Sequence, residues 1–145
     1  MKTILVVDDN SNDAELVITA LRETCSSAAI EVVQDGAEAL DYLFRRGIYA
    51  QRTGTPDVVL LDIKMPKVDG LEVLRKVKAD PVLRLVPVVM LTSSQEDRDV
   101  VQSYQHNANG YVVKPVDFTE FISAVQGLGE FWGIINVSPN LRNAP

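Results

Sequence analysis

The 145-residue sequence has few side chains that could cross-link the chain or bind a soft metal. It contains one cysteine, Cys25, and one histidine, His106. A disulfide needs two cysteines, and a structural zinc site is built from several cysteine and histidine ligands, so disulfide and zinc scaffolds are excluded. A chain of this length buries about two thirds of the surface that its unfolded form exposes. It can therefore form a hydrophobic core without such support.

The sequence also lacks an excess of basic residues and any long apolar stretch. It has 14 Lys and Arg against 20 Asp and Glu, a net charge of −6, and its basic residues are scattered. Nucleic acids are bound by clustered Lys and Arg, which argues against a nucleic-acid partner. The apolar stretches at 4–7 and 86–91 are far shorter than the ~20 residues that span a bilayer. The pair Asp8 and Asp9 also ends the first stretch too early for a signal peptide. We therefore expect a cytoplasmic protein with no membrane partner.

Five apolar runs rich in β-branched residues predict β-strands. Turn-forming residues bound each of them, and they span Thr3 to Val7, Ile30 to Val33, Val58 to Leu61, Pro87 to Leu91 and Tyr111 to Val113. The first, third and fourth runs are continuously apolar, as expected of central strands that are covered on both faces. The second contains Glu31 and the fifth is short, so these two strands are expected at the edges of a sheet.

The segments between these runs have apolar residues at the three-to-four spacing of amphipathic helices. In the first segment, Asn12 and Glu15 have the spacing of a helix N-cap and its partner three residues later. The other four helices are expected over about 37–46, 71–77, 96–105 and 118–131.

Strand and helix alternate five times, so 145 residues divided by five gives 29 per unit, close to the ~30 of a βαβ unit. This alternation predicts an α/β protein with a flavodoxin-like, doubly wound parallel sheet of order 2-1-3-4-5. Residues 1–131 are expected to form this domain. Residues 132–145 form a tail that carries Trp132 and further apolar residues after the fifth unit, and no output domain is expected.

Polar residues that follow the strands all occur at the same end of the predicted sheet. Asp8 and Asp9 follow the first strand and Asp62 ends the third. Thr92 and Lys114 follow the fourth and fifth strands. Because the carboxyl ends of parallel strands face one crevice, the three carboxylates are expected to converge where the winding reverses. A single Asp after a strand is usually a helix cap or loop residue, but this combination from four strand ends indicates a site.

Three carboxylates placed together repel one another unless a cation lies between them. Oxygen donors suit a hard divalent ion, and Mg²⁺ is the expected choice because it also bridges to phosphate oxygens. A carboxylate beside Mg²⁺ can attack phosphorus and form an aspartyl phosphate. Lys114 and Thr92 would then supply an ammonium and a hydroxyl donor to the new phosphoryl oxygens. The residues therefore predict a phosphoryl acceptor site.

The sequence resembles the receiver domain of two-component response regulators. The matching motifs occur in the family's order: ILVVDDN (4–10), LLDIKMPKVDG (60–70), VVMLTSS (88–94) and GYVVKP (110–115). The resemblance implies a signalling protein in a phosphorelay, with at most slow self-dephosphorylation, rather than an enzyme.

The resemblance also implies a role for each matching residue. Asp62 is the expected phosphoacceptor, and Asp8 and Asp9 form the acidic pocket. By the same resemblance, Mg²⁺ is expected to be bound directly by Asp9, Asp62 and the main-chain carbonyl of Lys64, and through a water by Asp8. Thr92 and Tyr111 are expected to form a switch. Lys114 is expected to bind phosphate, and the peptide bond before Pro115 is expected to be cis. Mn²⁺ or Ca²⁺ is expected to replace Mg²⁺ in vitro.

The chain further resembles the single-domain regulators that are paired with bacterial phytochromes and related histidine kinases. This likeness lies in the long loop before the third strand, the segment SYQHNANGYVVKP and the ending GLGEFW with its apolar tail. It implies a sensor histidine kinase, with a bacterial phytochrome as one candidate, as phosphodonor. It also implies a homodimer that forms through the fifth helix and the tail.

Three other classes of function can be compared with the sequence. An aspartate-based phosphohydrolase typically has a second Asp two residues after its nucleophile, but here that position is Lys64. A phosphorylation-independent scaffold would need none of the acceptor residues, all of which are present. A flavin or nucleotide binder on the same fold would need a glycine-rich or hydroxyl-rich loop after the first strand, where this chain has DDNSND.

Overall fold

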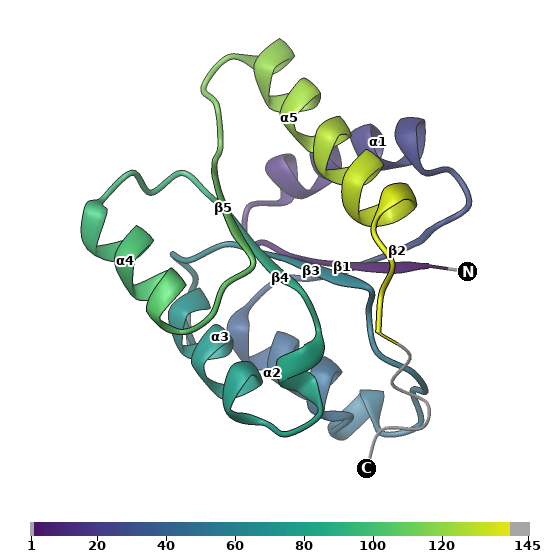
Figure 1. Cartoon of the computed structure of the whole chain (residues 1–145), viewed down its shortest axis with the longest axis vertical. Coiled ribbons are helices and arrows are strands. Elements are labelled where there is room, and N and C mark those ends of the chain that lie inside the picture. Colours follow the sequence, from purple (N-terminus) through teal and green to yellow (C-terminus); the bar gives the residue numbers. More distant parts are fainter. Residues whose placement is uncertain (1, 140–145) are drawn as a thin grey trace.

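Five parallel strands form a single sheet at the centre of the molecule (Figure 1). The structure, a computed structural model, describes residues 2–139. The strands lie in the order β2-β1-β3-β4-β5, which confirms the predicted doubly wound arrangement. Their bounds are β1 Thr3–Val7, β2 Ala29–Val33, β3 Val58–Leu61, β4 Val88–Thr92 and β5 Gly110–Val113.

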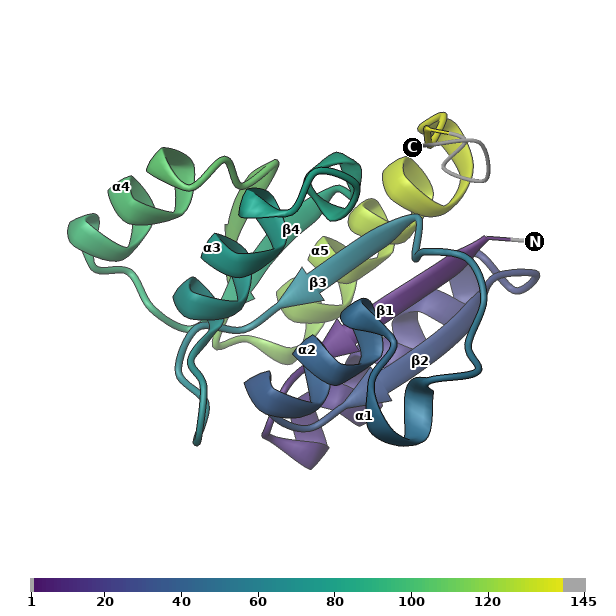
Figure 2. The ribbon, with the colours of Figure 1, turned by 90° about the horizontal axis from the view of Figure 1, so that it is seen from below.

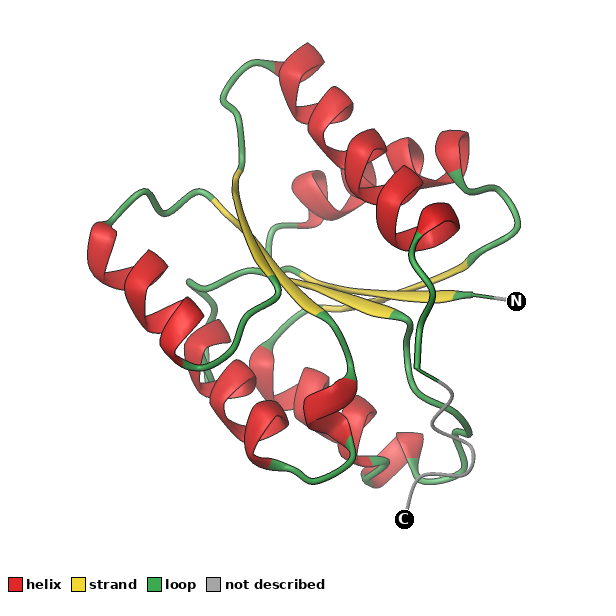
Figure 3. Cartoon of the chain, in the orientation of Figure 1, coloured by secondary structure: helices red, strands yellow, loops and turns green. Residues whose placement is uncertain are grey.

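Helices cover both faces of the sheet, α1 and α5 on one side and α2, α3 and α4 on the other (Figures 1 and 3). Their bounds are α1 Ser11–Thr24, α2 Gly36–Phe44, α3 Gly70–Ala79, α4 Asp97–Gln105 and α5 Phe118–Glu130. Figure 2 shows β1 and β3 side by side in the middle of the sheet, where they pair in parallel. No helix of residues 2–139 is long and apolar enough to cross a membrane.

Successive side chains of the central strands enter two separate cores. In β1, Ile4 and Val6 pack in the core under α1 and α5, whereas Leu5 and Val7 pack in the core under α2 and α3. This division follows from the alternation of side chains along a strand. It explains why the central strands are apolar at every position. The edge strands β2 and β5 are more exposed, as predicted.

The start of α1 differs from the sequence prediction. Its N-cap is Asn10, not Asn12, because the Asn10 side chain accepts hydrogen bonds from the backbone N–H groups of Asn12 and Asp13. Asn10 is itself held at the end of β1, since its N–H donates to Asp8 Oδ1 at 2.9 Å. The helix therefore begins closer to the strand than its apolar pattern indicates.

The loop that joins α2 to β3 is fixed by an arginine. Gly47–Tyr49 forms a short 3₁₀ turn. The Arg52 guanidinium lies 3.8 Å from the centre of the Tyr42 ring, and its Nη2 donates to the Tyr42 carbonyl at 2.7 Å. Stacking on the ring and bonding to the same residue anchor the loop to the end of α2.

The chain continues from α5 into a π-helical turn, Phe131–Ile135. Trp132 packs against the core under α1 and α5, together with Leu128, so the apolar stripe of α5 continues into this turn. Gly133 lies so close to Cys25 that a Cβ there would be 3.2 Å from Sγ. Residues 140–145 of the tail, which include the apolar Leu141, lie outside the described residues.

Candidate functional site

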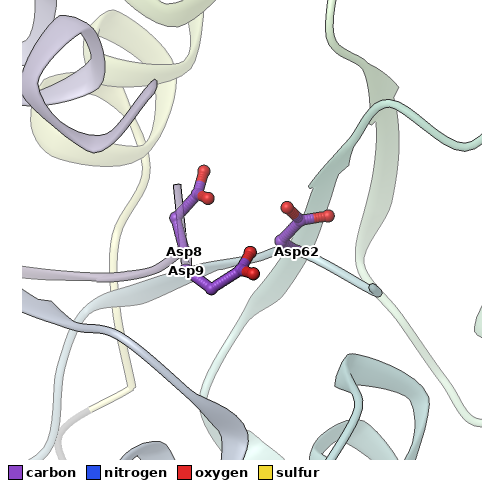
Figure 4. Close-up of side chains that lie close together, drawn as sticks. All are labelled: Asp8, Asp9 and Asp62. Carbon is purple, nitrogen blue, oxygen red and sulfur yellow. The ribbon is translucent and has the colours of Figure 1, made fainter. Parts of the chain in front are cut away.

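Three aspartates gather where β1 and β3 end. The strands pair with Val7 opposite Leu61, so the next residues, Asp8 and Asp62, lie at adjacent strand ends. The Asp62 N–H also donates to the Val7 carbonyl at 3.1 Å. One carboxylate oxygen from each of Asp8, Asp9 and Asp62 lies within 4.8 Å of the others. Figure 4 shows these side chains together. Asp8 and Asp62 are buried, whereas Asp9 is exposed. The predicted convergence is confirmed.

Lys114 brings an ammonium group into this cluster from the end of β5. Its Nζ lies 2.7 Å from Asp8 Oδ2 and 3.1 Å from Asp62 Oδ2. Burial lowers the pKa of the Lys114 ammonium, but its hydrogen bond to Asp8 and the charges of Asp62 and Asp8 outweigh burial and raise it above its usual range. In contrast, burial raises the pKa of the Asp8 carboxyl, and the hydrogen bond from Lys114 offsets this rise only in part.

Asp13, in the first turn of α1, is a third carboxylate partner of Lys114 and was not anticipated from the sequence. Its Oδ2 lies 3.1 Å from Lys114 Nζ. An ammonium has three N–H donors, and contacts with Asp8, Asp13 and Asp62 use all of them. Asp13 faces the site because Asn10 is the N-cap of α1. The sequence pattern Asp-Asp-Asn-x-x-Asp at 8–13 could have indicated that Asp13 lies near the other aspartates. It predicts the contact with Lys114 only once Asn10 is known to be the N-cap.

The donor set fits a hard divalent cation. It consists of carboxylate oxygens alone, and Lys114 offsets only one of the negative charges of Asp8, Asp9 and Asp62. The remaining negative charge favours a divalent ion, and Asp9 is exposed to solvent. The main-chain carbonyl of Lys64 stays a predicted ligand.

The groups predicted to form the switch lie on the next two strands. Thr92 is fully buried at the end of β4, and its Oγ1 accepts a hydrogen bond from the Ser94 N–H at 3.3 Å. Tyr111, on β5, is half-buried, and its hydroxyl donates to the Ser94 carbonyl at 3.0 Å. Thr92 and Tyr111 are thus connected through the backbone of Ser94.

The expectation of a cis peptide bond between Lys114 and Pro115 is wrong for this structure. All peptide bonds of the described residues are trans. The trans form of an X–Pro bond is favoured by about 0.5–1 kcal/mol, and with this bond trans Lys114 reaches all three of its carboxylate partners.

The loop that follows Asp62 is held by a close contact with α3. A Cβ built on Gly70 would lie 2.0 Å from the Asp62 carbonyl oxygen, and the Gly70 N–H donates to the Ile63 carbonyl at 2.8 Å. Only glycine allows the two backbones to approach so closely. The start of α3 therefore helps to position Asp62.

Comparison with known proteins assigns the chain to a family. Residues 4–126 match the response regulator receiver domain. The chain belongs to this family, whose members act in two-component signalling.

Three relatives are response regulators that this chain covers over most of their length. Rcp1 of Synechocystis is 36% identical over 131 residues, 90% of this chain and 88% of Rcp1. The crystal structure of its Mn²⁺-bound form superimposes with a TM-score of 0.92 at 34% identity, covering 97% of this chain and 100% of that one. The phosphorylated cyanobacterial phytochrome response regulator RcpA has a TM-score of 0.91 at 37% identity, covering 96% and 99%. The bacteriophytochrome response regulator RtBRR is 52% identical, with a TM-score of 0.76 over 96% of this chain and 84% of its own.

Proposed function

We propose that this response regulator accepts a phosphoryl group on Asp62 from a sensor histidine kinase in the cytoplasm. The observation that carries the proposal is the position of the buried Asp62 carboxylate, 3.1 Å from Lys114 Nζ and within 4.8 Å of carboxylate oxygens of Asp8 and Asp9. A nucleophile is thus next to both a cation and a set of metal-binding oxygens. The Mn²⁺-bound form of the related Rcp1 supports divalent metal binding by this chain.

In the proposed reaction, an oxygen of Asp62 attacks the phosphorus of a phosphohistidine or of acetyl phosphate. The new bond joins this oxygen to phosphorus, and the bond from phosphorus to the leaving imidazole or acetate breaks. Asp9, Asp62 and the Lys64 carbonyl would hold Mg²⁺ directly and Asp8 would hold it through a water, and the bound ion would supply positive charge to the transferring group. Lys114, which already contacts Asp62, would exchange this contact for one with a phosphoryl oxygen while it keeps Asp8 and Asp13.

A phosphorylation assay with a small donor tests this proposal without a kinase. The chain is incubated with ³²P-labelled acetyl phosphate and Mg²⁺, and bound label is measured for the unaltered chain, Asp62→Asn and the control Asp69→Asn. Asp69 caps α3 through a hydrogen bond that an asparagine can also accept. We expect label in the unaltered chain and the control and none in Asp62→Asn. Label retained in full by Asp62→Asn would refute the assignment, and rapid release of phosphate over many cycles would favour a phosphohydrolase.

The output of the phosphorylated form is proposed to be a change in the surface formed by α4, β5 and α5. A phosphoryl group that draws Thr92 toward Asp62 would break the hydrogen bond between Thr92 Oγ1 and the Ser94 N–H. The Ser94 carbonyl also holds the Tyr111 hydroxyl. Movement of this loop would therefore reach Tyr111, and such coupled contacts are the basis of a two-state switch.

A phytochrome-type histidine kinase is the proposed phosphodonor. Support comes from RcpA and RtBRR, both described as phytochrome response regulators. Transfer from a panel of purified, autophosphorylated histidine kinases would test this. We expect a phytochrome-type kinase to transfer faster than the others, and equal transfer from unrelated kinases would contradict the proposal.

We also propose a homodimer through α5 and the tail, residues 132–145. The support is a set of exposed apolar side chains after α5: Ile134 is 56% exposed, Ile135 60% and Val137 89%. Ile134→Ser and Ile135→Ser together should shift sedimentation toward the monomer. Ile48→Ser is the matched control, because Ile48 is 89% exposed but lies in the loop after α2. Unchanged sedimentation of the double variant would contradict the proposed interface.

A further inference from the structure

A buried carboxylate outside the aspartate cluster, that of Asp99 in the first turn of α4, joins the two loops that follow β3 and β4. Its side chain is 4% exposed and its Oδ2 lies 3.7 Å from Lys64 Nζ. The Ser94 hydroxyl donates to the same oxygen at 2.6 Å. The start of a helix also favours negative charge. Ser94 and Lys64 are the only side chains of the described residues that contact this carboxylate through a hydrogen bond or ion pair.

Both partners of Asp99 are close in sequence to functional groups. Lys64 follows Asp62 by two residues, and Ser94 follows Thr92 by two. The side chain of Lys64 is 58% exposed, so only one end of this ion pair is buried. Among residues 2–139, Lys64 has no ion pair with Asp62. Its ammonium is thus held on α4 rather than on the acceptor carboxylate.

Phosphorylation of Asp62 would create a second, more highly charged partner for Lys64. A phosphoryl group carries up to two negative charges, and a lysine two residues away has a flexible stem that can reach it. The Lys64 ammonium can then form an ion pair with either Asp99 or the phosphoryl oxygens.

We propose that Asp99 is a positioning residue that holds the Lys64 ammonium away from the phosphoryl group and so shortens the lifetime of phosphorylated Asp62. The inference rests on the proposed function. In hydrolysis, the oxygen of a water forms a bond to phosphorus, the bond from phosphorus to the Asp62 oxygen breaks, and the water's protons pass to the phosphate and to solvent. Asp62 leaves as a carboxylate.

The direction of the effect follows from the space that Lys64 would occupy at the phosphoryl group. A lysine has a long, flexible stem, and its ammonium would be drawn to the negative phosphoryl oxygens. Bound there, the Lys64 side chain would occupy space beside the phosphorus and hinder the approach of the attacking water. Lys64 released from Asp99 should slow hydrolysis.

The test measures the hydrolysis rate of the phosphorylated full-length chain in Mg²⁺ after the labelled donor is removed. Asp99→Asn keeps an acceptor for the Ser94 hydroxyl but loses the charge that holds Lys64. We expect hydrolysis to slow about two- to fivefold, the range for an ion pair with one exposed partner. Asp97→Asn, which removes an exposed carboxylate from the same helical turn, should leave the rate unchanged. Asp99→Ser is measured in parallel, in case an amide at this position prevents folding.

The double variant Asp99→Asn, Lys64→Gln distinguishes positioning from a general structural effect. We expect it to regain most of the lost rate, because slowing requires the released ammonium. Equal slowing with and without Lys64 would overturn the inference, as would unchanged rates in Asp99→Asn and Asp99→Ser. Failure of the unaltered chain to take up label would overturn the proposed function and this inference with it. Uptake followed by equal rates in all chains would overturn the inference alone.

Discussion

Replacement of Lys114 by methionine should destabilise the chain in the absence of a divalent cation. Lys114 is 8% exposed, and its removal leaves the buried carboxylates of Asp8 and Asp62 without their shared cation. Oxygens of these carboxylates lie within 4.8 Å of each other, and two unit charges at that separation repel by about 3 kcal/mol at an effective dielectric constant of 20. Loss of one partner from a buried ion pair costs a similar ~3–5 kcal/mol. We therefore expect the free energy of unfolding to fall by about 3 kcal/mol.

Urea unfolding near neutral pH in a chelating buffer measures this loss, with circular dichroism and the fluorescence of the single tryptophan as probes. For a slope of about 2 kcal/mol per molar urea, the midpoint should fall by about 1.5 M. Lys76→Met is the matched control, because Lys76 is half exposed and its nearest carboxylate, on Glu72, is 3.8 Å away. Its midpoint should hardly change.

Two further results would show whether charge repulsion is the cause. Addition of Asp62→Asn to Lys114→Met should restore most of the lost stability, since it removes one of the two repelling charges. Mg²⁺ at about 100 times its Kd should stabilise the Lys114→Met chain by about 2.7 kcal/mol. A loss below about 1 kcal/mol, or a loss that Asp62→Asn does not repair, would refute the reasoning.

Two other predictions concern the fold around the site. Gly70→Ala should lower the free energy of unfolding by more than about 3 kcal/mol, because its Cβ would meet the Asp62 carbonyl oxygen at 2.0 Å. Gly127→Ala places no atom within 4 Å of the new Cβ and should raise the free energy of unfolding by about 0.5–1 kcal/mol. Urea unfolding measures both changes. Burial and the hydrogen bond to Glu38 raise the pKa of Tyr49 to about 12, so the stability from this phenol is fully present below pH ~10 and is lost as the pH rises through about 12. The stability difference between the unaltered chain and Tyr49→Phe should therefore shrink over that interval, and ultraviolet titration of tyrosinate should lose a step near pH 12 in the variant.

The strands could be predicted to within one residue because their signal is local. Runs of β-branched and other apolar residues mark all five strands, and those of β1, β3 and β4 are largely buried whereas β2 and β5 are more exposed. The convergence of Asp8, Asp9 and Asp62 then followed from the parallel sheet alone, since strand order determines which carboxyl ends are neighbours. These parts of the site depend on the backbone and not on the rotation of a helix.

The parts that were not predicted depend on tertiary contacts. The segment DDNSND offers several N-cap residues, and the bond from the Asn10 N–H to Asp8 decides between them. That choice rotates α1 and brings Asp13 to Lys114. Likewise, the pattern of α4 gives no sign that Asp99 is buried while Asp97 in the same turn is exposed. Only packing against the loop that contains Ser94 makes this distinction.

Chemical trapping of the phosphorylated residue tests the central claim most directly. The unaltered chain is phosphorylated with acetyl phosphate in Mg²⁺, reduced with borohydride, which converts an acyl phosphate to an alcohol, and mapped by peptide mass spectrometry. We predict homoserine at position 62 and unmodified aspartate at positions 8, 9 and 13. Homoserine at another aspartate, or at none, would contradict the account.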